Sequence, residues 1–413
     1  MPSMADYRPR LVDHLLTELL ASLPAVLLVG PRATGKTTTA AQHAKTIVRL
    51  DREPEAIAFR SDPDAALREL EEPVLLDEWQ MVPGVLGAVK RAIDGDFRPG
   101  RFLITGSVRA ELEAAGWPMT GRVVRVPLYG MTVKEQLGRV GTRPLIDRIV
   151  DGEALALPPE VPDLRDYVDI ALRGGYPEPV LHLSAADRRN WLESYVEQVL
   201  TRDVPQLDGP RDPLRMRRWL EAYALNSAGV VSDATLYDAA GVDRRTSVAY
   251  ERLLANLLVI DAVPAWTTRR LRRLTQAPKR YLVDPSLMVA LLRVDTAAVM
   301  RDGNLLGRLL DTFVASQLRA ELPTISSRPH LYHLRQAEGR NEVDLIAELG
   351  AERLVAFEVK ATAAPGSDDA RHLVWLRDNL GDRFVAGVVF HTGPRRYRLG
   401  DGIEAVPICA LWA

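Results

Sequence analysis

Residues 25–37 read Ala25-Val-Leu-Leu-Val29-Gly30-Pro-Arg-Ala-Thr-Gly35-Lys36-Thr37, an apolar run followed by a glycine-rich turn. The run suits a buried parallel strand, and residues 38–44 after the turn are compatible with a helix. The turn matches G-x-x-x-x-G-K-[ST] in the strand-then-helix context that this motif requires. Its glycines let successive backbone N–H groups face an anion, and the helix N-terminus adds free donors. The stretch therefore predicts a phosphate-binding loop.

In such a loop Lys36 neutralises the β- and γ-phosphates, and the Thr37 hydroxyl can ligate Mg²⁺. We therefore predict ATP and Mg²⁺ as ligands. A chance glycine-rich turn is the alternative, and the flanking strand and helix argue against it. The residues assigned to nucleotide binding are Gly30, Pro31, Arg32, Ala33, Thr34, Gly35, Lys36, Thr37 and Thr38.

A second motif, Val74-Leu-Leu-Asp77-Glu78, is an apolar strand that ends in two carboxylates. In P-loop ATPases the first acid holds Mg²⁺ through water, and the second can polarise the attacking water. A helix cap or a solvated turn is the alternative. However, adjacent acids at the end of a buried strand are costly unless a cation lies there. We therefore assign Asp77 to the metal and Glu78 to catalysis.

Two further segments supply candidate catalytic side chains. Ile104-Thr105-Gly106-Ser107 ends another apolar run, so Thr105 or Ser107 could reach the γ-phosphate or the water; a plain strand-to-loop turn is the alternative. Gly121-Arg122 precedes the next strand, and Arg122 could stabilise transition-state charge in cis or from a neighbouring chain. We name Ser107 and Arg122 as candidates.

Composition restricts the class of protein. The chain has 413 residues, which predicts more than one domain, and a formal net charge of −2, so any basic surface must be local. Its one cysteine, Cys409, excludes internal disulfides, Cys₄ zinc sites and iron–sulfur clusters held by this chain alone. Neither a signal-peptide pattern nor an apolar run of about 18 residues is found. We expect a cytoplasmic protein without a membrane span.

The order of patterns along the chain predicts the fold class. Apolar runs at residues 47–50, 74–76, 102–104 and 123–126 alternate with helical stretches, which predicts a three-layer αβα core. The middle of the chain is mostly helical. Strand patterns return at residues 331–334, 342–347, 354–359 and 384–390, with helix patterns at 305–318 and 371–379. A second, separate α/β unit is therefore expected.

The second unit contains an acid–acid–lysine pattern. Asp344 lies in one strand, and Glu358 and Lys360 share one face of the next because side chains alternate with period two. A turn near Gly350 would make the strands a hairpin, so that Asp344 and Glu358 share Mg²⁺ and Lys360 offsets developing negative charge. Asp311, upstream, could add a ligand. The spacing resembles the PD-(D/E)XK nuclease core; a salt-bridged polar strand face and an inactive nuclease-like fold are the alternatives.

Taken together, the motifs resemble those of the bacterial and archaeal AAA-type ATPases that carry a C-terminal domain of unknown function (AAA_14 with DUF4143). The resemblance spans nearly the whole chain. It is carried by the segments at residues 30–37, 76–80, 104–107, 121–122, 173–178, 201–204 and 281–284, and by the pair 342–344 and 358–360. It implies that Lys36, Thr37, Asp77 and Glu78 are the nucleotide and metal residues, and that Ser107 and Arg122 fall in the sensor and Gly-Arg positions.

The resemblance also implies four domains: an AAA-type P-loop core at 1–130, a helical lid at 131–212, a winged-helix-like module at 213–295, and a nuclease-like C-terminal domain at 296–413. In the third, residues 242–250 fit a turn into a second helix, with Leu253, Leu254, Leu257 and Leu258 as its core face. Arg244, Arg245 and Arg252, with the basic segment 269–273 as a wing, could contact phosphates. A solvated basic surface or a protein contact is the alternative.

These patterns predict Mg²⁺-dependent ATP binding and hydrolysis, coupled to a nuclease-like domain that acts on or binds DNA or RNA. The alternative is a non-nucleolytic, ATP-dependent scaffold that binds a protein partner. A simple kinase is disfavoured by the Asp77-Glu78 pair and the long downstream region. The predicted partners are ATP, DNA or RNA, and further copies of the chain in a homo-oligomer, with no membrane.

Overall fold

The computed structural model describes residues 7–106, 117–208, 211–268, 276–336 and 340–413. The chain divides into two compact units. The first consists of the residues up to Met131 together with Asn256–Leu258, and the second contains the rest. Each unit is described by itself below.

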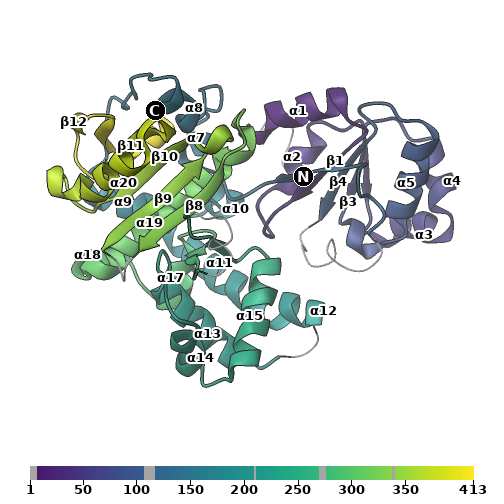
Figure 1. The fold of residues 1–413 in the computed structure, drawn as a ribbon. Coiled ribbons are helices and arrows are strands. Elements are labelled where there is room, and N and C mark those ends of the chain that lie inside the picture. The colour runs from purple at the N-terminus through teal and green to yellow at the C-terminus, as the bar shows by residue number, and fades with distance from the viewer. Residues whose placement is uncertain (1–6, 107–116, 209–210, 269–275, 337–339) are drawn as a thin grey trace. The chain divides into compact units, whose positions relative to one another are not determined.

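The first unit is built on a parallel sheet that helices cover on both faces (Figure 1). Its strands are β1 (Ala25–Val29), β2 (Thr46–Arg49), β3 (Val74–Asp77), β4 (Phe102–Gly106) and β5 (Val124–Pro127). Its helices are α1 (Val12–Ser22), α2 (Lys36–Ala41), α3 (Glu53–Ser61), α4 (Pro63–Arg68), the short 3₁₀ turn η2 (Trp79–Met81) and α5 (Val85–Gly95). The strand order is β2-β3-β4-β1-β5, and every pairing is parallel.

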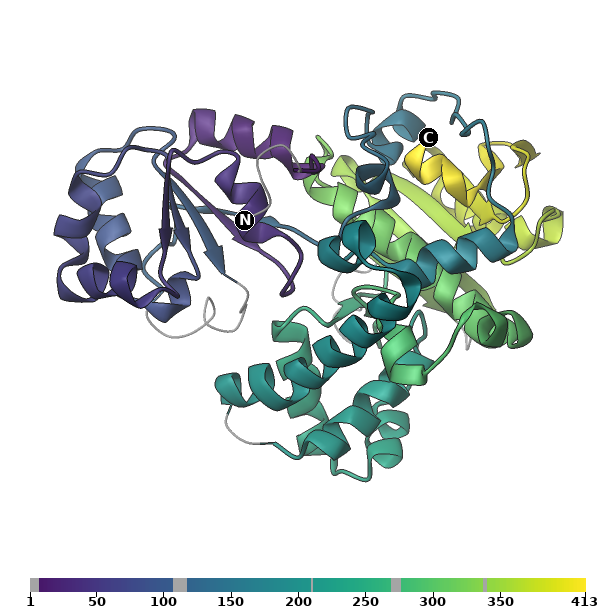
Figure 2. The ribbon, with the colours of Figure 1, turned by 180° about the vertical axis from the view of Figure 1, so that it is seen from behind.

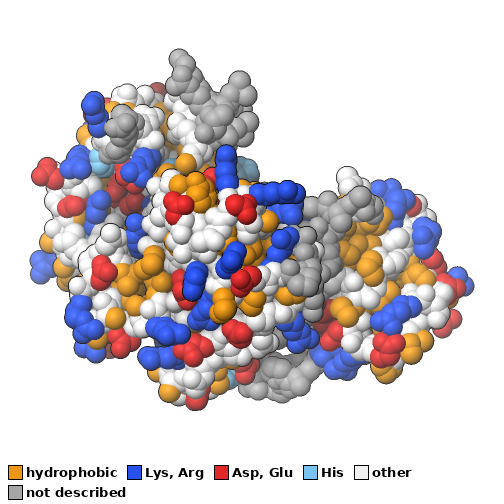
Figure 3. Space-filling view, turned by 90° about the horizontal axis from the view of Figure 1, so that it is seen from below, with side chains coloured by type: hydrophobic (Ala, Val, Ile, Leu, Met, Phe, Trp, Pro, Cys, Tyr) orange, Lys and Arg blue, Asp and Glu red, His pale blue; other side chains and the backbone are white. Residues whose placement is uncertain are grey.

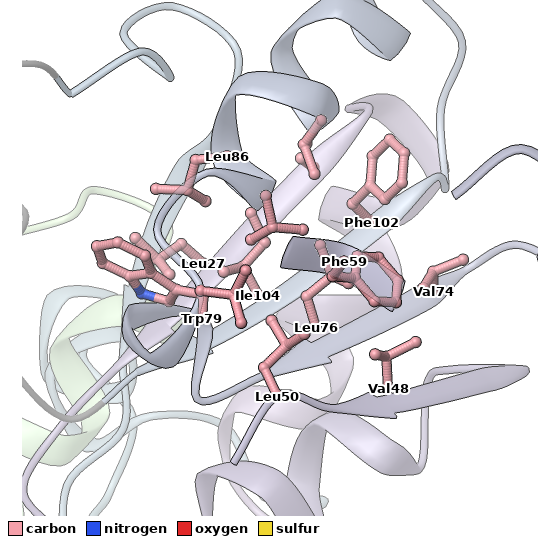
Figure 4. Packing of buried hydrophobic residues seen from close by; sticks show 14 of the residues in the cluster. Leu27, Val48, Leu50, Phe59, Val74, Leu76, Trp79, Leu86, Phe102 and Ile104 are labelled. Atoms are coloured by element: carbon pink, nitrogen blue, oxygen red, sulfur yellow. The ribbon is translucent and has the colours of Figure 1, made fainter. Parts of the chain in front are cut away.

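Alternating side chains of β1 explain the three layers. Leu27 belongs to one buried cluster with Phe59 of α3 and Leu86 of α5, and this packing is seen from close by in Figure 4. Val26 and Leu28 belong to the opposite cluster, with α1 and α2. A strand that buries both faces must be apolar throughout, as Ala25–Val29 is. The predicted αβα core is confirmed.

The second unit begins with helices and ends with a sheet (Figure 2). Its helices include α7 (Val133–Gln136), α8 (Leu145–Val150), α9 (Leu164–Arg173), α10 (Pro177–His182), α11 (Ala185–Gln198), α12 (Val204–Asp208), α13 (Pro213–Leu225), α14 (Asp233–Ala240), α15 (Arg244–Asn256), α17 (Leu287–Leu292), α18 (Thr296–Arg301), α19 (Gly303–Glu321) and α20 (Arg371–Leu380). A π-helical turn, Val199–Asp203, joins α11 to α12.

Within the helical part, α13, α14 and α15 are followed by an antiparallel pair, β6 (Ile260–Val263) and β7 (Lys279–Leu282). Gly241, in the left-handed region at φ 61°, ends α14, and Asp243 caps α15 by accepting a hydrogen bond from the Thr246 N–H. The four leucines expected to form the inner face here are all buried. Three helices followed by two strands is the order of a winged helix, and that assignment stays a prediction. The predicted wing, 269–273, lies outside the described residues.

The C-terminal sheet is mixed. Its strands are β8 (His330–Gln336), β9 (Asn341–Glu348), β10 (Leu354–Val359), β11 (Phe384–His391), β12 (Tyr397–Gly400) and β13 (Ile403–Pro407), in the order β12-β13-β11-β10-β9-β8. β8, β9 and β10 are antiparallel neighbours, whereas β10 and β11 are parallel and are joined through α20. One buried cluster packs α20 on the sheet, and α19 contacts β10. The predicted second α/β unit is confirmed.

Candidate functional site

The phosphate loop joins β1 to α2, as the sequence predicts. Gly30 follows the strand, and a Cβ there would lie 2.0 Å from the Leu128 carbonyl oxygen, so only glycine fits. Ala33 and Gly35 are in the left-handed region, at φ 59° and 87°. These two positions turn the chain back before α2 begins at Lys36. The loop therefore presents its backbone at the carboxyl edge of the sheet, where α/β proteins bind ligands.

Lys36 is buried within this loop. Its ammonium donates to the Pro31 carbonyl at 2.6 Å and to the Gly30 carbonyl at 3.1 Å. Burial lowers the pKa of Lys36 to about 8, against the opposing effect of the nearby Glu78 carboxylate. A triphosphate would give this charge a stronger acceptor than two carbonyl oxygens.

Three oxygen atoms meet at the end of β3. The hydroxyl groups of Thr37 and Thr105 both donate to Oδ1 of Asp77, at 2.7 and 2.5 Å. They come together because β4, which carries Thr105, lies between β1 and β3 in the sheet. A buried carboxylate beside a hydroxyl is a hard oxygen donor set, which Mg²⁺ prefers, and it lies beside the loop. Thr37 and Asp77 therefore fit the magnesium role predicted for them.

Glu78 follows in the left-handed region, at φ 54°, and accepts a hydrogen bond from the Gln80 amide. Burial raises its pKa above the ordinary glutamate value, although Lys36 acts in the opposite direction. Asp77 and Glu78 thus diverge: Asp77 faces Thr37, and Glu78 lies close enough to Lys36 for their charges to interact. This arrangement suits one metal ligand and one base.

Arg10 is a site residue that the sequence did not reveal. Its buried guanidinium donates to the Thr34 carbonyl of the phosphate loop and to the Tyr129 carbonyl after β5, both at 2.8 Å. The two contacts fix one side of the loop to the sheet. Because Arg10 lies 119 residues from Tyr129, no local pattern could have identified it.

The other two predicted catalytic residues of the first unit, Ser107 and Arg122, are not seen beside the phosphate loop. Ser107 lies outside the described residues, whereas its neighbour Thr105 contacts Asp77. Arg122 precedes β5 and pairs with Asp94 near the end of α5, at 2.5 Å. Since β5 runs parallel to β1 and Val124 lies level with Val26, Arg122 is at the sheet edge opposite the loop. This position does not support a role in cis, and a role in trans stays a prediction.

In the second unit the predicted acids and lysine lie close together. β9 and β10 are antiparallel, with Leu345 paired to Phe357, so the register places Asp344 opposite Glu358. Oδ2 of Asp344 accepts the Val359 N–H at 3.0 Å, and Oε2 of Glu358 accepts the Lys360 ammonium at 2.9 Å. The connection is the 3₁₀ turn Gly350–Glu352, as expected.

A lysine that the sequence analysis did not name also belongs to this cluster. The buried ammonium of Lys279, on β7, lies 2.5 Å from Asp311 and 2.8 Å from Asp344. Asp311, on α19, also accepts the Tyr281 hydroxyl at 2.9 Å. We call these five charged residues the carboxylate–lysine cluster: Lys279, Asp311, Asp344, Glu358 and Lys360.

Charges within the carboxylate–lysine cluster compensate one another. Burial alone would lower the pKa of Lys279, but Asp311 and Asp344 hold it well above its ordinary value. Burial also opposes ionisation of Asp344, yet Lys279 and its hydrogen bonds hold the Asp344 pKa below the usual value. Burial and Asp344 raise the pKa of Glu358 well above normal. Lys279 and Asp344 therefore form an ionised pair in which Lys279 is buried and Asp344 is partly buried.

The exposed side of α15 carries the predicted phosphate contacts. Arg244, Arg245 and Arg252 are exposed there. A hollow beside them is lined by Arg211, Arg245, Thr246, Val248, Ala249 and Arg252. On the face that Figure 3 shows, basic and acidic side chains are interspersed. Because the formal net charge of the chain is only −2, the basic character of α15 is local.

Two other sequence motifs meet in the second unit. The Gly175 N–H donates to the buried Asp284 carboxylate at 2.9 Å, and a Cβ on Gly174 would lie 2.4 Å from Oδ1 of Asp284. Ser286 also donates to Oδ1 through its N–H and its hydroxyl. The segments 173–178 and 281–284 thus have a structural role, which is to join α9 to the turn after β7.

Comparisons with known proteins agree with this architecture. Family profiles match an AAA domain at residues 22–137, a domain of unknown function (DUF8612) at 164–298 and a domain of unknown function (DUF4143) at 306–411. The uncharacterized proteins Rv2008c of Mycobacterium tuberculosis and Mb2031c of Mycobacterium bovis are each 31% identical over 398 residues, 95% of this chain and 82% of theirs.

Among solved structures, the Walker-type ATPase PABY2304 of Pyrococcus abyssi aligns with a TM-score of 0.44 and 15% identity, over 70% of this chain and 97% of that one. A score below 0.5 does not establish a common fold. Among the described residues, no helix is long and apolar enough to cross a membrane. Because the chain matches both domain profiles and is 31% identical to two mycobacterial proteins over 95% of its length, it belongs to the family of AAA-type ATPases with a C-terminal DUF4143 domain.

Proposed function

We propose that the first unit binds ATP with Mg²⁺ and hydrolyses it. The observation that carries this proposal is the meeting of the Thr37 and Thr105 hydroxyls on Asp77, beside the loop that buries Lys36. Backbone N–H groups of residues 30–37, except Pro31, which has none, would hold the phosphates, and Lys36 would neutralise the charge on the β- and γ-groups. Bound Mg²⁺, held by Thr37 and Asp77, would neutralise further phosphate charge.

Glu78 acts as the base in this proposal. Its carboxylate would accept a proton from water as the water attacks the γ-phosphorus, and the bond from that phosphorus to the bridging oxygen would break. Thr105 holds Asp77 in position through its hydroxyl. Ser107 as a polar sensor and Arg122 as a finger from a neighbouring copy in a homo-oligomer remain part of the proposal.

ATP affinity tests this function. Replacing Lys36 by alanine removes a charged partner of the phosphates, which is worth about 2 kcal/mol, so ATP should bind roughly thirtyfold more weakly. Affinity is measured by calorimetry with a slowly hydrolysed ATP analogue, and hydrolysis by phosphate release with Mg²⁺ or EDTA. Lys45→Ala, on the surface of the same unit, is the control. Unchanged affinity in Lys36→Ala, or hydrolysis that survives EDTA, would contradict the proposal.

For the second unit we propose nucleic-acid binding through the exposed arginines of α15, on a winged-helix-like module. Arginine side chains on a helix surface are suited to phosphate contacts, which release counterions. Metal-dependent cleavage of DNA or RNA by Asp344, Glu358 and Lys360 stays a prediction, supported by their proximity across β9 and β10. The rival is a scaffold that binds a protein partner and no nucleic acid.

Salt dependence distinguishes these alternatives. Binding of generic DNA and RNA is measured by fluorescence anisotropy between low and physiological salt, on wild type and on Arg245→Ala. If Arg245 contacts a phosphate, its loss should reduce the slope of log K against log salt by about one. Arg60→Ala, an exposed arginine of the first unit, should leave the slope unchanged. Absence of salt-sensitive binding in the wild type would favour the scaffold.

A further inference from the structure

The ammonium of Lys279 is fully engaged in the carboxylate–lysine cluster. It has three N–H groups, and three acceptors surround it: Oδ2 of Asp311 at 2.5 Å, Oδ1 of Asp344 at 2.8 Å and the Asp344 backbone carbonyl at 3.3 Å. Its side chain is 3% exposed. Lys279 is therefore a buried cation surrounded by oxygen acceptors, two of which belong to carboxylates, as a metal ion would be.

The remaining oxygen atoms of these acids are also largely used. Oδ2 of Asp344 accepts the Val359 N–H, and Oδ1 of Asp311 accepts the Tyr281 hydroxyl. On Glu358, Oε2 accepts Lys360, and Oε1 alone is buried without a hydrogen-bond partner among the described residues. A divalent cation needs several oxygen ligands at about 2.0–2.6 Å. As arranged, the cluster does not fit a divalent cation together with Lys279.

We propose that Lys279 is an internal substitute for a divalent cation, and that Asp311 and Asp344 bind such a cation only when Lys279 is removed from between them. The inference does not depend on ATP hydrolysis. It bears on the predicted nuclease chemistry, which would require Lys279 to leave its position first. The ligand class is a hard divalent cation, for which Mn²⁺ is the probe.

β7 links Lys279 to the helices of the same unit. Lys279 and Tyr281 both contact Asp311, whereas Arg280, between them, pairs with Asp233 of α14 at 2.6 Å and with Glu251 of α15 at 3.1 Å. The position of Lys279 is thereby tied to α14 and α15. A displacement of those helices is the route by which the cation would be withdrawn.

Mn²⁺ binding to the full chain tests the proposal. Free Mn²⁺ is followed by electron paramagnetic resonance during titration, without nucleotide, on wild type, Asp344→Asn, Lys279→Met, and Lys279→Met combined with Asp344→Asn. Wild type and Asp344→Asn should bind the same amount. Lys279→Met should bind about one Mn²⁺ more per chain, because the carboxylates of Asp311 and Asp344 then lack their cation, and the added Asp344→Asn should remove it. Any binding near Asp77 is common to all four proteins.

Stability gives a second measurement, because Lys279→Met leaves buried carboxylates unpaired and folds less well. Mn²⁺ should raise the melting temperature of Lys279→Met. In wild type this site should contribute no such rise, because Lys279 occupies it. Lys279→Arg keeps the cation and should gain no Mn²⁺. If Lys279→Met does not fold even with Mn²⁺, the inference is tested by the amount of Mn²⁺ that wild type and Asp344→Asn bind, which should be the same.

Two results would overturn the inference. These are a wild-type Mn²⁺ site, measured without nucleic acid, that Asp344→Asn loses, and a folded Lys279→Met that gains no Mn²⁺. A chain that hydrolyses no ATP would contradict the proposed function and leave these Mn²⁺ measurements interpretable.

Discussion

Glu78→Gln should hydrolyse ATP roughly a thousandfold more slowly than wild type, because general-base catalysis contributes about 10²–10⁴ to a rate. Glutamine has the shape of glutamate and retains an oxygen that can accept the Gln80 amide, but it cannot take a proton from water. Lys36, Thr37 and Asp77 remain in place, so ATP affinity should change little. Phosphate release under saturating Mg²⁺ and ATP measures the first quantity, and calorimetry the second.

Glu69→Gln is the matched control for Glu78→Gln, because Glu69 is an exposed glutamate of the same unit. It should hydrolyse ATP at the wild-type rate. The pH profile adds a check: the base must be ionised, so wild-type hydrolysis should fall as the pH is lowered through the Glu78 pKa, which burial raises above the ordinary value. A Glu78→Gln chain with normal turnover would show that another group activates the water.

Glu321→Ala should destabilise the second unit by about 3–5 kcal/mol, since it leaves a buried charge without its partner. Glu321, at the end of α19, pairs with Lys134 of α7 at 2.7 Å, and the two side chains are 4% and 3% exposed. Its other oxygen accepts the Leu145 N–H at 3.0 Å, so the substitution also orphans a backbone donor. Urea denaturation followed by circular dichroism measures the loss.

Two variants separate this effect from a general loss of charge. Glu153→Ala removes an exposed partner of Arg143 and should change the free energy of unfolding by less than about 1 kcal/mol. Lys134→Met combined with Glu321→Leu should recover part of the loss, because neither charge is then buried alone. If the urea concentration at the midpoint of unfolding is the same for Glu321→Ala as for wild type, the Lys134–Glu321 pair contributes nothing to stability.

The sequence predicted those parts of the structure whose chemistry is local. Residues 25–37 contain the strand, the loop and the helix start in one continuous stretch, and Asp77-Glu78 ends a strand that is buried throughout. The hairpin of β9 and β10 could also be predicted, because period two and a short turn determine which of its side chains meet. In each case the partners lie within a short stretch or in consecutive elements.

Partners far apart in the chain were not predicted. Lys279 lies 65 residues from Asp344 and Arg10 lies 24 from Thr34, and each adopts its role only after the sheet has formed. β6, β12 and β13 were missed as well. β6 (IDAV) and β12 (YRLG) are short and interrupted by charged residues, so they lack the apolar run by which the sequence predicts a strand such as β3, and β13 continues into the apolar C-terminus without an obvious boundary.

The alternation of side chains along β7 has a consequence for how the chain tolerates insertions. Odd-numbered Lys279 and Tyr281 contact Asp311, while even-numbered Arg280 contacts Asp233 and Glu251. Adding or deleting a single residue just before this strand would shift its register by one and exchange the two sets. The guanidinium would then face a space shaped for an ammonium, and Asp233 and Glu251 would face Lys279 or Tyr281 in place of Arg280. Changes of two residues, which preserve the alternation, should be accommodated far more readily.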